Sequence, residues 1–125
     1  MSPQGGRIFV IDDDPTICRA LARLLGAAGY EVETFTSGNE LLQRTLPGRE
    51  DCVLLDVEMP GMTGPEVRNM LREMGCAAPV IFMTAHRGEP IAQHLRPELA
   101  FFKPIEGDAL LRAIADARPI APRGR

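Results

Sequence analysis

Polar side chains suited to phosphoryl chemistry follow four short apolar runs of this chain. The runs IFVI, CVLL, VIFM and AFF lead directly into Asp12, Asp56, Thr84 and Lys103. Short continuous apolar runs are typical of strands that are buried on both faces. In an open parallel α/β sheet, ligands bind just beyond the carboxyl ends of the strands. Parallel strands here would bring carboxylates, a hydroxyl and an ammonium to one edge, where they could hold a divalent cation and a phosphoryl group.

Three adjacent acids, Asp12, Asp13 and Asp14, follow the first run. Asp14 suits a helix N-cap because Pro15 follows it, but the other two cannot both be caps. Adjacent carboxylates repel each other unless they are solvated or bound to a cation. Mg²⁺ typically uses one or two carboxylates together with waters and phosphate oxygens. The pattern therefore indicates a magnesium site, with a solvated, capping turn as the alternative.

The other three positions are each ambiguous alone. Asp56 ends a buried run and could be a carboxylate nucleophile towards a phosphoryl group, or the start of a Pro-Gly turn. The Thr84 hydroxyl could bond a phosphoryl oxygen, or simply end a strand. Lys103 could neutralise phosphoryl charge, or be solvated. The conjunction of all four positions favours the phosphoryl interpretation.

Strand-like runs alternate with stretches of helical period along the chain. This alternation predicts a parallel sheet covered on both faces, and right-handed crossovers favour a doubly wound α/β fold. We expect strands over 7–11, 31–35, 52–55, 79–83 and 99–102, and helices over 15–28, 37–46, 65–74 and 108–117. Residues 85–98 carry a poor signal, with room for one short helix around 91–95.

Three of the predicted helices have a recognisable apolar face. Gly29 is expected to end the first of them. The inward residues are predicted to be Ile17, Leu21, Leu24, Leu25 and Ala28 in the first helix, Val67, Met70, Leu71 and Met74 in the third, and Leu110, Leu111 and Ile114 in the last.

Length and composition indicate one ordinary globular domain. The chain has 125 residues, and its net charge of −3 indicates no general affinity for nucleic acid. Three cysteines without metal-type spacing are typical of a reducing cytosol, where they pack as small apolar groups. The start lacks a signal peptide, and no apolar run is long enough for a membrane span. We expect a cytoplasmic domain over 7–117, with flexible termini at 1–6 and 118–125.

The motifs IFVIDDDP, VLLDVEMPGMTG, VIFMTA and FFKP occur in this order. On them, residues 7–117 resemble the response-regulator receiver domain of bacterial two-component signal transduction, and LLDVEMPGMTGPEV is the most specific stretch. The resemblance implies a flavodoxin-like, three-layer α/β/α fold with five parallel strands in the order 2-1-3-4-5. It also implies a phosphoprotein of a phosphorelay, which is not an enzyme beyond its own phosphotransfer and dephosphorylation.

The resemblance assigns a role to each acid. Asp56 would accept a phosphoryl group from the phosphohistidine of a sensor kinase and would also be a metal ligand. Asp13 would bind Mg²⁺ directly, and Asp12 would assist through water. The backbone carbonyl of Glu58 would be a further metal ligand.

The resemblance also assigns roles around the phosphoryl group. Thr84 and Lys103 would contact it, and Thr84 would move inward as part of a two-state switch. Side chains at Glu58 and His86 would tune dephosphorylation.

The chain departs from the family on the usual signalling face. Most receivers have Tyr or Phe at the position of Ala100. Phe101 should point away from the side that Ala100 uses, because faces alternate in a strand, and Phe102 is expected in the core. The segment between Thr84 and Lys103 is shorter than usual and carries two prolines, Pro90 and Pro97. We therefore expect a short or irregular fourth helix and an atypical output switch.

The partners implied are a sensor histidine kinase or phosphotransfer protein and a downstream protein of unknown kind. No direct contact with nucleic acid or membrane is expected, and a homodimer through the fourth helix, fifth strand and fifth helix is left open. The chain is interpreted as a single-domain regulator or a fragment of a longer one. The alternatives are a non-phosphorylated interaction module and a haloacid-dehalogenase-type phosphatase, with Asp12 as nucleophile and Asp14 as acid/base.

Overall fold

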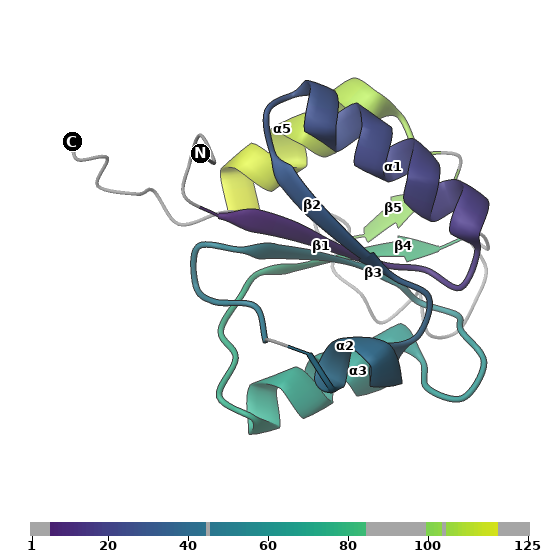
Figure 1. Ribbon diagram of the computed structural model, residues 1–125, viewed down its shortest axis with the longest axis vertical. Coiled ribbons are helices and arrows are strands. Elements are labelled where there is room, and N and C mark those ends of the chain that lie inside the picture. Colours follow the sequence, from purple (N-terminus) through teal and green to yellow (C-terminus); the bar gives the residue numbers. More distant parts are fainter. Residues whose placement is uncertain (1–5, 45, 85–99, 104, 118–125) are drawn as a thin grey trace.

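Five parallel strands form the centre of the molecule. The computed structural model describes residues 6–44, 46–84, 100–103 and 105–117. The sheet order is β2-β1-β3-β4-β5, which confirms the predicted order (Figure 1). The strands are β1 (Arg7–Ile11), β2 (Glu31–Phe35), β3 (Cys52–Asp56), β4 (Val80–Thr84) and β5 (Ala100–Phe102).

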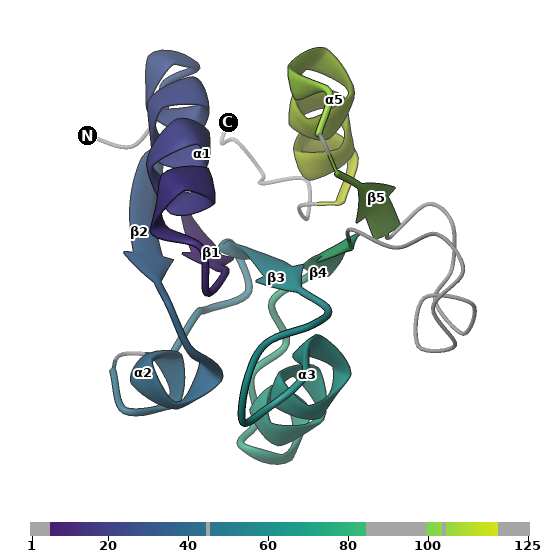
Figure 2. The ribbon, with the colours of Figure 1, turned by 90° about the vertical axis from the view of Figure 1, so that its right-hand side faces the viewer.

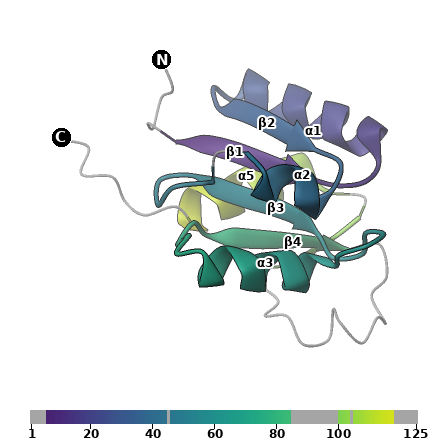
Figure 3. The same ribbon diagram turned by 60° about the horizontal axis from the view of Figure 1, so that its bottom comes forward.

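The described helices cover both faces of this sheet. On one face lie α1 (Pro15–Ala27) and α5 (Gly107–Ala117), and on the other lie α2 (Gly38–Leu42) and α3 (Gly64–Glu73) (Figures 2 and 3). Helices on both faces are the arrangement that parallel strands need in order to bury their two apolar surfaces. The predicted doubly wound, flavodoxin-like architecture is therefore confirmed.

Alternation along the strands divides the core into two clusters. In β1, Ile8 and Val10 pack in the cluster under α1 and α5, whereas Phe9 and Ile11 pack in the cluster under α2 and α3. All five residues of β3 and all five of β4 are buried, as the continuous apolar runs predict. The two clusters thus pack against opposite faces of the central strands.

The ends of α1 follow from local sequence. Asp14 is the N-cap, and its side chain accepts a hydrogen bond from the Thr16 amide at 2.9 Å. Gly29 adopts a φ of 102°, which is the left-handed conformation that glycine supplies after a helix. Both predictions are confirmed. Within the helix, Cys18, Leu21 and Leu25 are buried, but Ala28, predicted to face inward, is exposed.

Helix α2 is shorter than the predicted 37–46. It ends at Leu42, and Leu46 packs against the core from outside the helix. The proline at position 47 disfavours a helical backbone at the residue before it, which agrees with the position of Leu46 outside the helix.

The inward face of α3 is narrower than predicted. Val67 and Leu71 are buried, whereas Met70 is 38% and Met74 47% exposed. Met74 is the C-cap residue, beyond the last full turn, and Met70 lies beside the stripe formed by Val67 and Leu71. Both ends of β1 and β2 agree with the predictions, and the remaining strand and helix ends agree or differ by one residue.

Several predictions concern residues outside the described part of the chain. These are the short fourth helix and its two prolines, and both flexible termini except Gly6, which is buried. The side chains of Ala100 and Phe102 also lie outside the description. Phe101 packs partly buried against the cluster under α1 and α5.

Among the described helices, none combines the length and apolar character that crossing a membrane requires.

Candidate functional site

The register of the sheet brings the predicted site residues together. Ile11 pairs with Leu55, so Asp12 and Asp56 follow at the same level of neighbouring strands. Asp56 pairs with Met83, and Thr84 pairs with Phe102, the residue before Lys103. The Lys103 amide donates to the Thr84 carbonyl at 2.8 Å. The carboxyl edge of the four strands therefore gathers the side chains singled out from the sequence.

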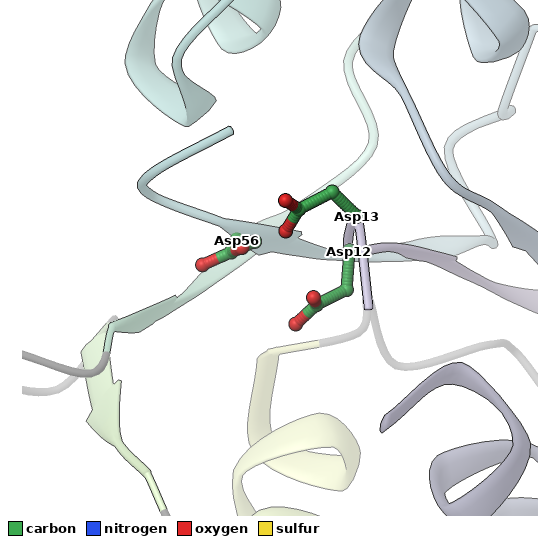
Figure 4. Close-up of side chains that lie close together, drawn as sticks. All are labelled: Asp12, Asp13 and Asp56. Carbon is green, nitrogen blue, oxygen red and sulfur yellow. The ribbon is translucent and has the colours of Figure 1, made fainter. Parts of the chain in front are cut away.

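Three carboxylates form an acidic pocket at this edge. Asp12, Asp13 and Asp56 each offer an oxygen within 4.8 Å of the others. Figure 4 shows Asp12 and Asp13 leaning towards Asp56 from the segment after β1. Asp12 and Asp56 are buried, whereas Asp13 is exposed. The cluster thus combines two buried carboxylates with one that is exposed to solvent.

Asp12 is the most enclosed acid, with 0% of its surface exposed. Its Oδ1 accepts a hydrogen bond from the Asp14 amide at 2.9 Å, which fixes the turn into α1. Its Oδ2 lies 2.8 Å from the Lys103 ammonium, but no hydrogen bond of ordinary geometry reaches this atom from the described residues. The contact with Lys103 is a close, charge-assisted ion pair.

Lys103 bridges two acids of the pocket. Its Nζ also lies 3.4 Å from Asp56 Oδ1, and 17% of its side chain is exposed. Burial works against the charged ammonium, but the close contact with Asp12 and the charge of Asp56 outweigh it and raise the pKa of Lys103. Lys103 therefore stays charged at neutral pH.

Asp56 is held in an environment that disfavours its charge. Burial, followed by the negative charge of Asp12, raises its pKa to about 6. The Lys103 charge and the Glu58 amide, which donates to Asp56 Oδ1 at 3.4 Å, offset part of this effect. At pH 7 Asp56 is ionised, with its carboxylate only weakly compensated. Neutralisation of this charge, by a bound cation or by a bond to an electrophile, would therefore lower the free energy of the site.

The donor set of the pocket fits a divalent cation. Oxygen ligands are what Mg²⁺ prefers, and carboxylates packed this closely need a counter-charge. Lys103 supplies one positive charge against three carboxylates, so a further cation would complete the counter-charge. The three carboxylates are therefore a candidate cation site.

The remaining predicted residues are placed as follows. Thr84 is fully buried at the end of β4, and Glu58 is partly buried just after β3. Ala100 lies in β5 opposite Phe82. His86 lies outside the described residues.

Two further residues shape the pocket and were not singled out for it from the sequence. The Cys18 thiol contacts the Asp12 carbonyl at 3.3 Å, while burial and then the Asp12 charge raise its pKa. Gly64 starts α3 so close to β3 that a Cβ there would lie 2.5 Å from the Asp56 carbonyl oxygen. The sequence does not show which group a cysteine on a helix face contacts. The glycine at the start of the helix, in contrast, could have indicated that the helix begins close to another part of the backbone.

Comparison with known proteins agrees with this geometry. A sequence model of the family described as response regulator receiver domain matches residues 8–115. The response regulator protein TodT of Pseudomonas putida is 35% identical over 128 aligned residues, which cover 100% of this chain and 56% of TodT. The chain thus spans about half the length of this curated relative.

Two solved structures share the fold. The response regulator StyR is 34% identical with a TM-score of 0.79, over 90% of this chain and 58% of StyR. The response regulator TrrA of Thermotoga maritima, solved in complex with Mg²⁺-BeF, is 30% identical with a TM-score of 0.73, over 90% of this chain and 98% of TrrA. Sheet order, acidic pocket and these matches lead to one conclusion: the chain belongs to the response regulator receiver domain family of two-component signalling.

Proposed function

We propose that this domain, over residues 7–117, is a phosphoacceptor in which Asp56 takes a phosphoryl group from the phosphohistidine of a sensor kinase or phosphotransfer protein. The observation that carries the proposal is the convergence of a buried, weakly compensated Asp56 with two further acids and an ammonium. An Asp56 oxygen would bond to phosphorus as the bond from phosphorus to the imidazole nitrogen breaks. The imidazole leaves with the electron pair of that bond.

Mg²⁺ is the cofactor that this proposal implies. Asp13 and Asp56 would hold it together with the Glu58 carbonyl, and Asp12 would assist through water. When bound, it would neutralise charge on the transferring phosphoryl group. Asp12 and Asp13 reach the pocket from one segment and Asp56 from another, which supports a shared ion.

Lys103 and Thr84 would complete the acceptor site. Lys103 already lies 3.4 Å from Asp56 Oδ1, where its charge could stabilise an incoming phosphoryl oxygen. Thr84 ends the strand next to β3, from where its hydroxyl would bond the phosphoryl group and shift the signalling surface. Glu58 and His86 would tune dephosphorylation.

The output step would differ from that of most receivers. Ala100 in β5 has no ring that could follow Thr84 inward. We propose that the output switch of this domain works without an aromatic side chain at this position. We expect no direct binding of nucleic acid by this domain, and a homodimer through the fourth helix, β5 and α5 stays open.

Phosphorylation by a small donor tests the proposal. The protein is incubated with acetyl phosphate and Mg²⁺, and the modified residue is located by mass spectrometry after trapping with borohydride. Modification at Asp56 that disappears in Asp56→Asn supports the proposal. Modification at Asp12 would favour the phosphatase alternative, and the absence of any modification would favour the non-phosphorylated interaction module.

A further inference from the structure

The peptide group between Asp12 and Asp13 links two of the three clustered acids. Because the two residues are consecutive, the orientation of this planar group limits where both carboxylates can point. Asp12 is buried and Asp13 is exposed, yet each has an oxygen within 4.8 Å of the other and of Asp56. Both side chains lean towards Asp56 (Figure 4). A contact that fixes this peptide group therefore also fixes the two acids relative to Asp56.

Asp12 is held through its backbone from two neighbouring elements. Its amide donates to the Phe35 carbonyl, at the end of β2, at 3.0 Å. Its own carbonyl, which belongs to the peptide group before Asp13, accepts a hydrogen bond from the Cys18 thiol of α1, with the sulfur at 3.3 Å. The same sulfur lies 3.7 Å from the Phe35 carbonyl oxygen. Cys18 thus contacts both carbonyl groups that fix the backbone of Asp12.

Cys18 is itself held in place. It is 3% exposed and lies in the first turn of α1, where its amide donates to the Asp14 carbonyl at 3.1 Å. The Asp14 amide in turn donates to Asp12 Oδ1 at 2.9 Å. Free cysteine usually packs as a small apolar group. This one also donates to the carbonyl between two candidate metal ligands, which gives it a second role beside packing.

We propose that Cys18 is a positioning residue of the candidate cation site: its thiol fixes the peptide group between Asp12 and Asp13, so that both carboxylates face the ion. This inference rests on the proposed function, because it needs a divalent cation held by these acids. Groups that hydrogen-bond to metal ligands orient them before the ion arrives, and their loss lowers metal affinity. A thiol is a weak donor and acts here through the backbone, so its effect is smaller than that of a direct partner of a ligand atom.

Isothermal titration with Mg²⁺ tests this role through affinity rather than activity. Cys18→Ala removes the donor and should bind Mg²⁺ about three- to tenfold more weakly than wild type. Cys18→Val fills the space of the thiol without a donor and should show a loss in the same range, which excludes a cavity as the cause. Cys18→Ser keeps a donor at this position and should stay within about twofold of wild type.

Cys76 provides a matched control. It is 5% exposed, and its thiol donates to the Pro47 carbonyl with the sulfur at 3.2 Å. Cys76 precedes β4 and Pro47 precedes β3, so this bond lies at the amino edge of the sheet. Cys76→Ala removes the same kind of hydrogen bond from a similarly buried position, and urea unfolding should show a loss of stability similar to that of Cys18→Ala. Its Mg²⁺ affinity should equal that of wild type.

The amide signal of Asp13 gives a second readout that needs no metal. This amide belongs to the peptide group whose carbonyl the Cys18 thiol contacts. In ¹⁵N-labelled, metal-free protein, the signal should move in Cys18→Ala and Cys18→Val and lie close to its wild-type position in Cys18→Ser. It should not move in Cys76→Ala.

The outcomes separate this inference from the proposed function. Equal Mg²⁺ affinity of wild type and Cys18→Ala, or a loss in Cys18→Ser as large as in Cys18→Ala, would overturn the positioning role and leave the cation site standing. An equal loss in Cys76→Ala would assign the effect to general destabilisation and would overturn the positioning role as well. Absence of Mg²⁺ binding to folded wild type would overturn the cation site and the positioning role with it.

Discussion

The charged carboxylate of Asp56 is almost completely buried from solvent. Only 4% of the residue is exposed, and the nearby Asp12 adds a second negative charge. The pKa of Asp56 rises from 3.8 to about 6, so the folded state binds this proton more tightly than the unfolded chain does. Ionisation of Asp56 consequently opposes folding above pH 6, and this penalty disappears as the pH falls towards 4. The acceptor position is thus maintained at a cost in stability.

Replacing Asp56 by Asn should therefore stabilise the metal-free protein at pH 7.5. A shift of roughly two pKa units corresponds to about 2 to 3 kcal/mol in the free energy of unfolding. The gain should shrink between pH 6 and pH 4, because wild-type Asp56 also becomes neutral in that range. Urea unfolding of both proteins at several pH values measures the difference.

Asp116→Asn is the control for this measurement. Asp116 is exposed on α5, so loss of its charge should change the stability little at any pH in the range. A destabilised Asp56→Asn protein at pH 7.5 would contradict the account of a poorly compensated Asp56.

Helix α3 is placed against the acceptor strand by a glycine. A Cβ at Gly64 would lie 2.5 Å from the Asp56 carbonyl oxygen, so Gly64→Ala must push α3 away from β3. We expect a loss of about 1 to 3 kcal/mol in unfolding free energy, in the range typical of overpacking, and weaker Mg²⁺ binding as the segment after Asp56 shifts.

Gly26→Ala is a matched substitution in another helix. Apart from its chain neighbours and the backbone of its own helix, no atom lies within 4 Å of a Cβ at Gly26 in α1. The loss of glycine should therefore stabilise the protein by about 0.5 to 1 kcal/mol. Urea unfolding of both variants tests the contrast. Equal effects of the two substitutions would mean that the close approach of α3 to β3 is unimportant.

The type and order of the described elements could be predicted because local signals agree with the global fold. The continuous apolar runs are the buried strands, and Asp14 and Gly29 mark the ends of α1 as predicted. The wrong predictions concern Ala28, which is exposed at the end of α1, and Leu46, whose position before a proline disfavours a helical backbone. They also concern Met70 and Met74, which only the packing of α3 on the sheet reveals to be exposed.

The sequence could predict which residues form the candidate site but not which of them contact each other. Strand ends meet at one edge of a parallel sheet, which makes Asp12, Asp56 and Lys103 neighbours in advance of any structure. The preference of Lys103 for Asp12, at 2.8 Å against 3.4 Å for Asp56, depends on side-chain packing across three strands. The same is true of the contact between the Cys18 thiol and the Asp12 carbonyl.

On the scale of the whole molecule, the two edges of the sheet do different work. Charge that opposes folding is concentrated at the carboxyl edge, whereas hydrogen bonds to Asp51 stabilise the amino edge. This acid is 6% exposed and accepts hydrogen bonds from the Arg7 amide at 2.7 Å and the Gly48 amide at 2.6 Å. Asp51 thereby ties the start of β1 to the segment before β3.

Asp51→Ala should therefore destabilise the protein and leave the pocket intact. Two amides would lose their acceptor, which costs about 2 to 3 kcal/mol in unfolding free energy. The Mg²⁺ affinity of the folded protein should not change, because the substitution lies at the far edge of the sheet. Urea unfolding and Mg²⁺ titration of the same sample measure both quantities.

Glu33→Ala provides the comparison at that edge. Glu33 pairs with Arg7 at 2.7 Å, but both side chains are about one third exposed, so the loss should stay below about 1 kcal/mol. A large loss of Mg²⁺ affinity in Asp51→Ala would contradict the separation of the two edges.

The identity of the phosphorylated residue tests the central claim most directly. Wild type and Asp56→Asn are incubated with acetyl phosphate and Mg²⁺, trapped with borohydride and mapped by mass spectrometry. The account predicts one modified residue, Asp56, and no modification in Asp56→Asn or when Mg²⁺ is removed with a chelator. Modification that persists in Asp56→Asn, or no modification of folded wild type at all, would contradict it.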